Sequence, residues 1–385
     1  MQRDPAALKA ALADLEQQSL RRRRRVGVAP GVVNFCSNDY LGLKDHPEVV
    51  RAFADAATKY GVGSGSAELV TGHGPEHQAL EEELAAFTGR QRALVFSTGY
   101  MANIGVISAL ADQKSVLVAD KLNHASLIDG CRLSAATVKR YRHADAAHAS
   151  ELLAAVEAAV NTRLLITDGV FSMDGDLAPL PELARTARVA GAWLIVDDAH
   201  GLGVVGGTGR GCCERFGLSE EDVPVLVGTF GKALGTFGAF VAGSAELIEY
   251  LLQKARTYIY TTAQPPALAA ATRAALRVMA RENWRREKVR ALAKRFRTAL
   301  RAQQIAPASL PDMAGESAIV PVIVGDPARA LALSQTLEQR GFLVTAIRPP
   351  TVPTGTARLR ITFSAAHEEA QVDALVAALL QALAQ

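Results

Sequence analysis

WLIVDDAH (193–200) is an apolar run that ends in two aspartates, an alanine and a histidine. A near-continuous apolar stretch of this length predicts a strand that is buried on both faces. VPVLVGTFGK (223–232) repeats the arrangement, with Thr229 and Lys232 at its end. The two stretches predict strands of one sheet that present polar groups at the same edge.

Similar apolar runs alternate with helical patterns through the middle of the chain. The other strand-like runs are ALVF (93–96), VLVAD (116–120), TVKRY (137–141) and RLLITDG (163–169). Helical patterns lie between the strands, in YMANIGVISALA (100–111), HASELLAAVEAAV (148–160) and PLPELARTARVAG (179–191). This alternation predicts an α/β fold with a mostly parallel sheet flanked by helices. GAFVAG (238–243) follows Lys232 too closely for a helical crossover, so it predicts an added antiparallel strand.

The pattern changes from about Pro265. A long helical stretch, three strand-like runs and a last helix follow, at 266–303, 317–325, 342–350, 357–364 and 368–383. We therefore expect a smaller C-terminal α+β domain at 265–385. It would follow a large α/β domain at 46–264 and an N-terminal helix and arm at 1–45.

The composition excludes several classes of protein. Among 385 residues, 49% are apolar and 21% charged, which is typical of a globular protein. The formal net charge of +3 gives no general attraction to nucleic acid or membranes. The four cysteines form no CxxC pair, so we expect no metal site and no disulfide framework, and a cytoplasmic location. No apolar run reaches membrane-spanning length.

Two local patterns have competing interpretations. RRRRR (21–25) fits a polyanion-binding segment, but also a solvated face at the end of an N-terminal helix. GLGVVG (201–206) matches a dinucleotide-binding pattern behind a strand. However, GTGRGCC (207–213) after it is a poor helix and the unit lies late in the sheet, which disfavours that function.

Polar groups follow five of the predicted strands. They are the helix start STGYMAN (97–103), His124, Ser172, Asp197 with His200, and Thr229 with Lys232. Each alone has an ordinary explanation, such as a capping residue or a lysine that reaches solvent along its apolar stem. Together they match what pyridoxal phosphate requires: a lysine nucleophile, a carboxylate for the ring nitrogen and a helix N-terminus for the phosphate.

VDDAHGLGVVG (196–206) and GTFGKALG (228–235) resemble the α-oxoamine synthases. These are fold-type I pyridoxal phosphate transferases that join an amino acid to an acyl-CoA and release carbon dioxide. Further matching segments follow in order, at NFCSNDYLGL (34–43), LNHASLIDG (122–130), GVFSMDGD (169–176) and YIYTTAQPPA (258–267). AIRPPTVPTGTARLRITFSAAH (346–367) most resembles the member in biotin biosynthesis, which condenses L-alanine with a pimeloyl thioester of coenzyme A or acyl carrier protein.

The resemblance implies catalytic roles for four residues. Lys232 would carry the cofactor and move the Cα proton of the substrate, and Asp197 would pair with the ring nitrogen. His200 would reach the phenolic oxygen, and His124 would stack on the ring. Further cofactor contacts are implied for Gly99, Tyr100, Ser172, Thr229 and, from a neighbouring subunit, Thr262.

The resemblance also implies substrate contacts and a symmetric homodimer. Asn38 and Arg360 would hold the amino-acid carboxylate, with Arg360 as a bidentate fork. Arg21 and Thr351 would face the acyl substrate. We expect small-molecule substrates and a second copy as partners, without nucleic acid or membrane.

Two departures from the family pattern leave details of the substrate channel open. SAEL (66–69) places Glu68 where the family often has a basic or tiny residue, and Asp168 stands where a glutamate is common. The cofactor motif also fits another α-oxoamine synthase that uses glycine or serine, or a fold-type I aminotransferase. A non-enzymatic polyanion binder that uses Arg21–Arg25 is the alternative from another class.

Overall fold

The computed structural model describes residues 4–157, 159–303 and 316–384. Contacts divide the chain into two compact units. The large unit holds residues 38–172 and 176–289, and the small unit holds residues 1–37, 173–175 and 290–385.

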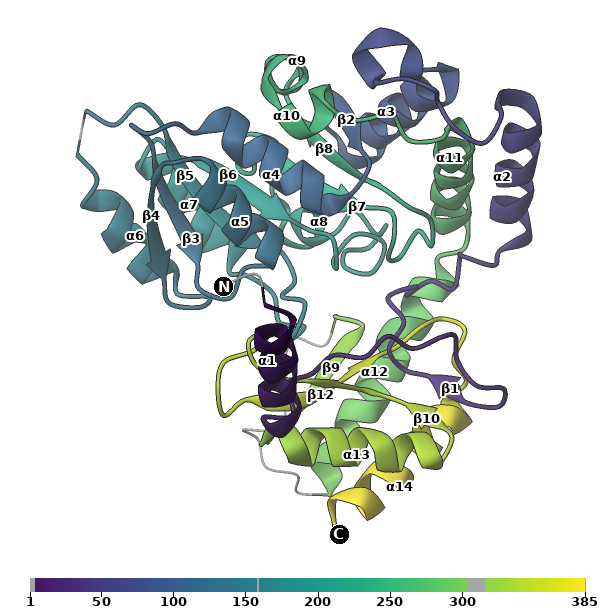
Figure 1. Ribbon diagram of the computed structural model, residues 1–385. Coiled ribbons are helices and arrows are strands. Elements are labelled where there is room, and N and C mark those ends of the chain that lie inside the picture. The colour runs from purple at the N-terminus through teal and green to yellow at the C-terminus, as the bar shows by residue number, and fades with distance from the viewer. Residues whose placement is uncertain (1–3, 158, 304–315, 385) are drawn as a thin grey trace. The chain divides into compact units, whose positions relative to one another are not determined.

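A seven-stranded sheet forms the centre of the large unit, in the order β2-β8-β7-β6-β5-β3-β4 (Figure 1). Its strands are β2 (Arg92–Phe96), β3 (Val116–Asp120), β4 (Thr137–Tyr141), β5 (Arg163–Asp168), β6 (Trp193–Asp197), β7 (Val225–Thr229) and β8 (Ala239–Gly243). Strands β3 to β7 are parallel to one another. β8 runs antiparallel to both β7 and β2, as the short connection after Lys232 predicts. The expected mostly parallel sheet is confirmed.

Helices cover both faces of this sheet, which explains why its strands are apolar without interruption. In β5, Ile166 packs into a core with residues of α4 (Gly99–Leu110), α5 (Ala125–Leu133), α9 (Ala245–Lys254) and α10 (Arg256–Ile259). The preceding residue, Leu165, packs on the opposite face of the sheet with residues of α6 (Ala146–Ala154), α7 (Leu180–Val189) and α8 (Cys212–Phe216). Successive side chains of one strand therefore supply two separate cores.

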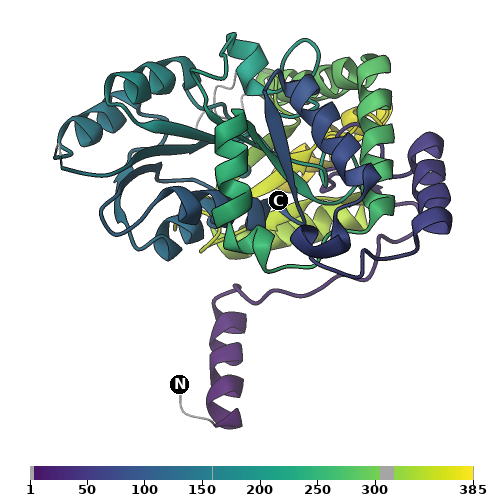
Figure 2. The same cartoon turned by 90° about the horizontal axis from the view of Figure 1, so that it is seen from above.

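Three helices form a further layer of the large unit. α11 (Pro266–Arg281) packs against α2 (Pro47–Tyr60) and α3 (Pro75–Thr88), and α11 lies beside α2 in both views (Figure 1, Figure 2). Small side chains allow this close approach, since alanines occupy much of the buried face of α11. α11 therefore belongs to the large unit, and the division falls at residues 289/290 where we expected 264/265.

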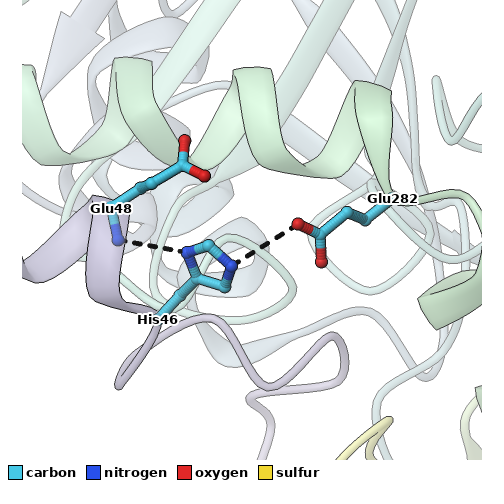
Figure 3. Close-up of side chains that lie close together, drawn as sticks. All are labelled: His46, Glu48 and Glu282. Carbon is cyan, nitrogen blue, oxygen red and sulfur yellow. Dashed lines mark hydrogen bonds and ion pairs between the residues drawn. The ribbon is translucent and has the colours of Figure 1, made fainter.

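Polar side chains join the start of α2 to the end of α11 (Figure 3). His46 caps α2 by accepting the Glu48 N–H at 3.3 Å, and its Nε2 lies 3.5 Å from Glu282. The ligand atoms of these three residues lie within 4.8 Å of one another, a spacing that a metal ion could use. However, Arg281 already pairs with the Glu48 carboxylate at 2.6 Å and Arg285 with that of Glu282 at 2.8 Å. We assign the cluster to helix packing.

The small unit is an α+β structure, as expected. β9 (Ile319–Gly325), β12 (Ala357–Thr362) and β11 (Thr345–Ile347) form an antiparallel sheet in the order β11-β12-β9. α13 (Pro327–Gln339), α14 (Glu369–Leu383) and much of α12 (Trp284–Ala302) belong to this unit. The N-terminal arm, with α1 (Pro5–Gln17), joins it because β1 (Val33–Asn34) pairs in parallel with β10 (Phe342–Leu343). None of the helices in the described residues is long and apolar enough to span a membrane.

We expect the central strands to dominate the stability of the large unit. Ile166→Ala removes a fully buried side chain and should lower the free energy of unfolding by about 2–5 kcal/mol. Val189→Ala is the control, because this side chain on α7 is 86% exposed. It should change the free energy of unfolding by less than about 0.5 kcal/mol. Guanidinium unfolding curves followed by circular dichroism measure both, and equal midpoints would contradict this assignment of the core.

Candidate active site

A cavity of about 280 Å³ opens at the carboxyl edge of the large sheet. Most residues that the sequence predicted for the site line it: Asn38, Gly99, Tyr100, His124, Asp197, His200, Thr229 and Lys232. They come from the ends of different strands and from the loops behind them. All of the lining residues belong to the large unit.

The N-terminus of α4 forms one wall of the cavity. Thr98 caps the helix by accepting the N–H of Met101 at 3.1 Å, and Gly99 is the first helical residue. A Cβ on Gly99 would lie 2.6 Å from Thr229 Cγ2, so only glycine fits against β7 here. Thr229 Oγ1 is buried without a hydrogen-bond partner among the described residues. An orphaned hydroxyl beside unpaired helix N–H groups is suited to bind a phosphate.

Asp197 ends β6 and is almost completely buried. Its Oδ2 accepts a hydrogen bond from Asn103 Nδ2 at 2.6 Å, and its Oδ1 accepts the N–H of Ala199 at 3.0 Å. Asn103 also donates to Ser126 Oγ at 2.9 Å. These donors fix the orientation of a carboxylate that faces the cavity, and such a carboxylate can hold a protonated ring nitrogen.

Sequence analysis did not identify Asn103, although a signal was present. It is a single amide in an otherwise apolar helical run, YMANIGVISALA, and it is only 1% exposed. A buried amide requires hydrogen-bond partners. Its position four residues after Gly99 places it one turn further along the helix that opens at the cavity.

His124 caps α5 and lies within hydrogen-bond distance of Ser126, with 2.7 Å between Nδ1 and Oγ. Burial lowers the pKa of His124, and the nearby charge of Lys232 lowers it further, whereas Asp197 opposes both. The ring is therefore neutral at physiological pH, which suits a residue that stacks on a cofactor ring.

Asp168 is also buried, at the end of β5, and burial together with the neighbouring Asp197 raises its pKa. Its Oδ2 accepts the backbone N–H of His124 at 2.7 Å. The shorter side chain that departs from the family pattern therefore reaches the loop that carries His124.

His200 contacts a residue that sequence analysis missed. Its Nδ1 lies 2.7 Å from the Tyr40 hydroxyl, which also donates to Asn38 Oδ1 at 3.1 Å. Tyr40 lies within NFCSNDYLGL (34–43), the segment already marked by resemblance, and it is fully buried. The contact joins two predicted site residues, Asn38 and His200.

Lys232 lies in a tight loop after β7, half-buried at the cavity wall. The N–H of Gly235 closes the turn on the Lys232 carbonyl at 2.9 Å. Gly235 has a φ of +65°, and a Cβ there would lie 2.3 Å from the backbone nitrogen of Lys44. The glycines around Lys232 thus let backbone pack against backbone while the lysine faces the cavity.

Gly201, the first glycine of GLGVVG (201–206), and Gly211 behind the pattern have another use. Asp198 is fully enclosed, and its Oδ2 accepts the N–H of Cys212 at 2.6 Å. A Cβ on Gly201 would lie 2.0 Å from Asp198 Oδ1, and one on Gly211 would lie 1.9 Å from its Oδ2. Burial raises the pKa of Asp198 to about 7. These two glycines make room for a carboxyl group of the protein itself.

Comparisons with known proteins agree with this geometry. Residues 30–379 match the family model of class I and II aminotransferases. The chain belongs to this family. An 8-amino-7-oxononanoate synthase of Methylococcus capsulatus is 57% identical, with 99% of each chain covered. The enzyme of the same name from Pseudomonas putida KT2440 is 54% identical over 98% of this chain and 97% of its own length.

Solved structures of class I and II aminotransferase relatives have the same fold. A serine palmitoyltransferase variant of S. paucimobilis, with a bound PLP–myriocin aldimine, superposes with a TM-score of 0.91 at 32% identity, covering 99% of this chain and 98% of that one. An 8-amino-7-oxononanoate synthase of Francisella tularensis has a TM-score of 0.78 at 31% identity, covering 92% and 98%.

Several predicted site residues do not line the cavity. Ser172 and Thr262 belong to the large unit but are not among the lining residues, and Thr262 pairs with Ala67 in an isolated bridge. Arg21, Thr351 and Arg360 belong to the small unit. Arg360 is buried on β12. The roles of these five residues remain predictions.

The arginine run is largely engaged within the small unit. Arg21 and Arg23 pair with Glu16 at 3.1 and 3.0 Å. Arg25 pairs with Glu338 at 2.5 Å, and Arg22 donates to the Thr351 hydroxyl at 3.2 Å. These contacts favour a structural role for the run over a polyanion-binding surface.

A half-buried histidine anchors the end of the loop that contains Ser172. His143 lies between Asp120, at the end of β3, and Asp176, with distances of 3.1 and 3.0 Å to its two ring nitrogens. Burial alone would lower the pKa of His143, but the hydrogen bonds to the two carboxylates raise it to about 10. A charged His143 therefore joins Asp176, at the end of the loop, to Asp120 of the sheet.

We expect His143 to contribute stability that is lost at high pH. Because its folded pKa of about 10 exceeds the ordinary 6.5, the contribution is complete below about pH 6.5 and declines as pH rises through 10. His143→Gln should lower the Tm by roughly 5 °C at pH 7, and this gap should narrow above pH 10. Differential scanning calorimetry across this range measures the gap, and a constant value would contradict the charge assigned to His143.

Proposed function

We infer that this protein condenses L-alanine with a pimeloyl thioester to give 8-amino-7-oxononanoate, carbon dioxide and the free thiol carrier, a step of biotin biosynthesis. The relatives of that name, more than half identical over nearly the full chain, support the assignment. The observation that carries it is one cavity that unites Lys232, the buried carboxylate of Asp197 and the N-terminus of α4.

The residues of the cavity fit pyridoxal phosphate. Within the described parts of the chain, Thr229 Oγ1 has no hydrogen-bond partner, and it lies beside the N-terminus of α4, where the phosphate would bind. Asp197 would keep a proton on the ring nitrogen, and the neutral His124 would cover one face of the ring. When bound, the cofactor supplies an electron sink for a carbanion at the Cα of the amino acid.

The protein's own groups then perform the proton transfers and the positioning. Lys232 would take the Cα proton of alanine as a neutral amine and return a proton to the product carbon. Asn38 and Arg360 would hold the amino-acid carboxylate until it leaves as carbon dioxide. Arg21 and Thr351 would orient the acyl thioester, so that its carbonyl carbon meets the deprotonated Cα.

We propose a symmetric homodimer in which Thr262 reaches the cofactor phosphate of the second copy. The isolated bridge with Ala67 holds the backbone of Thr262 at the end of the loop 260–264. We also propose a cytoplasmic location, which the four free cysteines support. Neither nucleic acid nor a membrane is a proposed partner.

Replacement of the proposed nucleophile should abolish catalysis. Lys232→Ala should reduce product formation by roughly 1,000-fold or more, because it removes both the covalent anchor and the base. Borohydride should fix the cofactor to the native protein but not to this variant. Lys254→Ala, which removes an exposed lysine at the end of α9, is the control and should behave as the native enzyme does. Full activity of the Lys232 variant would refute the proposal.

A substrate panel distinguishes the related functions. Alanine, glycine and serine are each offered with pimeloyl, acetyl and palmitoyl thioesters, and amino-ketone and carbon dioxide are quantified. We expect alanine with the pimeloyl thioester to give the highest kcat/KM. A clear preference for glycine or serine would assign another condensing enzyme of the same type. Conversion of a keto acid without release of carbon dioxide would indicate an aminotransferase.

A further inference from the structure

Two segments of the large unit lie side by side and together place Thr262. The backbone of Ala67 pairs with Thr262, and the N–H of Ala263 donates to the Ser66 carbonyl at 2.9 Å. The Ser64 hydroxyl donates to the Gln264 carbonyl at 2.5 Å. The segment 64–72 therefore determines where the backbone of Thr262 lies.

The packing between these segments leaves no space for adjustment. A Cβ on Gly72 would lie 2.4 Å from the Ser66 carbonyl oxygen and 2.7 Å from the Ala263 Cβ. The segment ends in η1 (Glu68–Gly72), a π-helical turn. Such turns are rare, and they occur often at functional sites. An interaction within this uncommon turn would help to hold it against the second segment.

Glu68 supplies such an interaction from inside the turn. It is only 9% exposed, and its Oε2 lies 3.1 Å from Nδ1 of His73, the residue that directly follows η1. The hydrogen bond to Glu68 raises the pKa of His73 to about 9, so the imidazole is charged at physiological pH. The ion pair thus joins the first residue of the turn to the residue after its end.

The titratable groups around the pair come from three other elements. Two are charged or acidic, Glu81 of α3 and Arg92 of β2, and the third, Tyr258 of α10, is a neutral phenol with a raised pKa. Gln78 of α3 lies 3.3 Å from the other ring nitrogen of His73. Glu81 accepts the N–H of Val95 at 2.9 Å, and burial raises its pKa to about 7. In this environment His73 pairs with Glu68. Without His73, Glu68 would lack its partner and face the nearby Glu81. Without Glu68, His73 would lose its own ion-pair partner.

The outer surface of the same two segments is apolar. Val62, Val70 and Tyr260 are 89%, 73% and 71% exposed. Val70 lies within the segment 64–72, and Val62 and Tyr260 lie two residues before the paired stretches. They agree with the second copy that the proposed homodimer places here.

We propose that the Glu68–His73 ion pair is a brace that positions Thr262 for the phosphate site of the second copy. Glu68 is adjacent to Ala67, whose backbone holds Thr262, so the brace acts one residue away from the bridge. This inference rests on the proposed function, because it requires a cofactor phosphate near Thr262. It also assigns a role to the residue that departs from the family pattern: Glu68 acts inside the protein and not as a contact to substrate.

A double-mutant cycle on cofactor binding tests the brace. The dissociation constant of pyridoxal phosphate is measured by visible absorbance for the native protein, Glu68→Gln, Thr262→Ala and the double variant. We expect each single variant to weaken binding about tenfold, and the double variant to be no weaker than Thr262→Ala alone, because both changes act through the same hydroxyl. His73→Gln provides a second way to remove the pair and should match Glu68→Gln.

Glu246→Gln is the matched control, since it removes an exposed carboxylate from the first turn of α9. It should leave cofactor affinity unchanged. Additive effects of Glu68→Gln and Thr262→Ala would overturn the brace, as would unchanged affinity in Glu68→Gln. The substrate panel on the native enzyme judges the proposed function separately, because it does not depend on either variant.

The pH dependence gives a second readout that a simple packing role would not change. His73 loses its charge as pH rises through about 9, so native cofactor affinity should fall between pH 8 and 10. Glu68→Gln should lack this component of the decline, because its His73 has no carboxylate partner. Burial keeps the pKa of Tyr258 well above this range, and the pKa of Glu81, about 7, lies below it. The titration of the cofactor itself is common to both profiles. Parallel profiles would overturn the proposal.

Discussion

A carboxyl group buried at the end of a central strand is the constraint on which the rest of the site depends. Burial of Asp197 is costly unless donors replace the lost water. The donors are the backbone of its own loop and Asn103. Because Asn103 also holds Ser126, which contacts His124, one carboxylate connects β6, α4 and α5. The ring-binding groups are thus held in one continuous network and do not lie on independent loops.

The fold could be predicted because its strands are buried on both sides. Leu165 and Ile166 must both be apolar when they belong to cores on opposite faces of the sheet, and this requirement produces the continuous runs that mark the strands. The parallel arrangement also brings the strand ends to one edge, which identified Asp197, His200 and Lys232 together. The short connection to 238–243 predicted the antiparallel direction of β8, since a crossover helix does not fit there.

Contacts between distant segments escaped prediction from the sequence. No sequence motif indicates the hydrogen-bond partners of Asn103 and Tyr40. These hydrogen bonds form only when the helix of Asn103 and the segment of Tyr40 pack in the folded protein. The boundary between the two units differs from the expected position, 264/265, for a similar reason. The helical pattern at 266–303 continues through Glu282 without a proline or glycine, and only the packing of α11 on α2 shows to which unit that helix belongs.

The glycines around Asp198 have a consequence for the assignment of function from sequence patterns. A loop that must wrap closely around a buried carboxyl group and a loop that must wrap closely around a pyrophosphate both exclude side chains. A glycine such as Gly201 can therefore serve either an acid within the protein or an anion from outside. A search for dinucleotide enzymes that relies on glycine spacing alone will collect chains of this kind. An aspartate three residues before the first glycine, at the end of the same strand, offers a simple way to separate them.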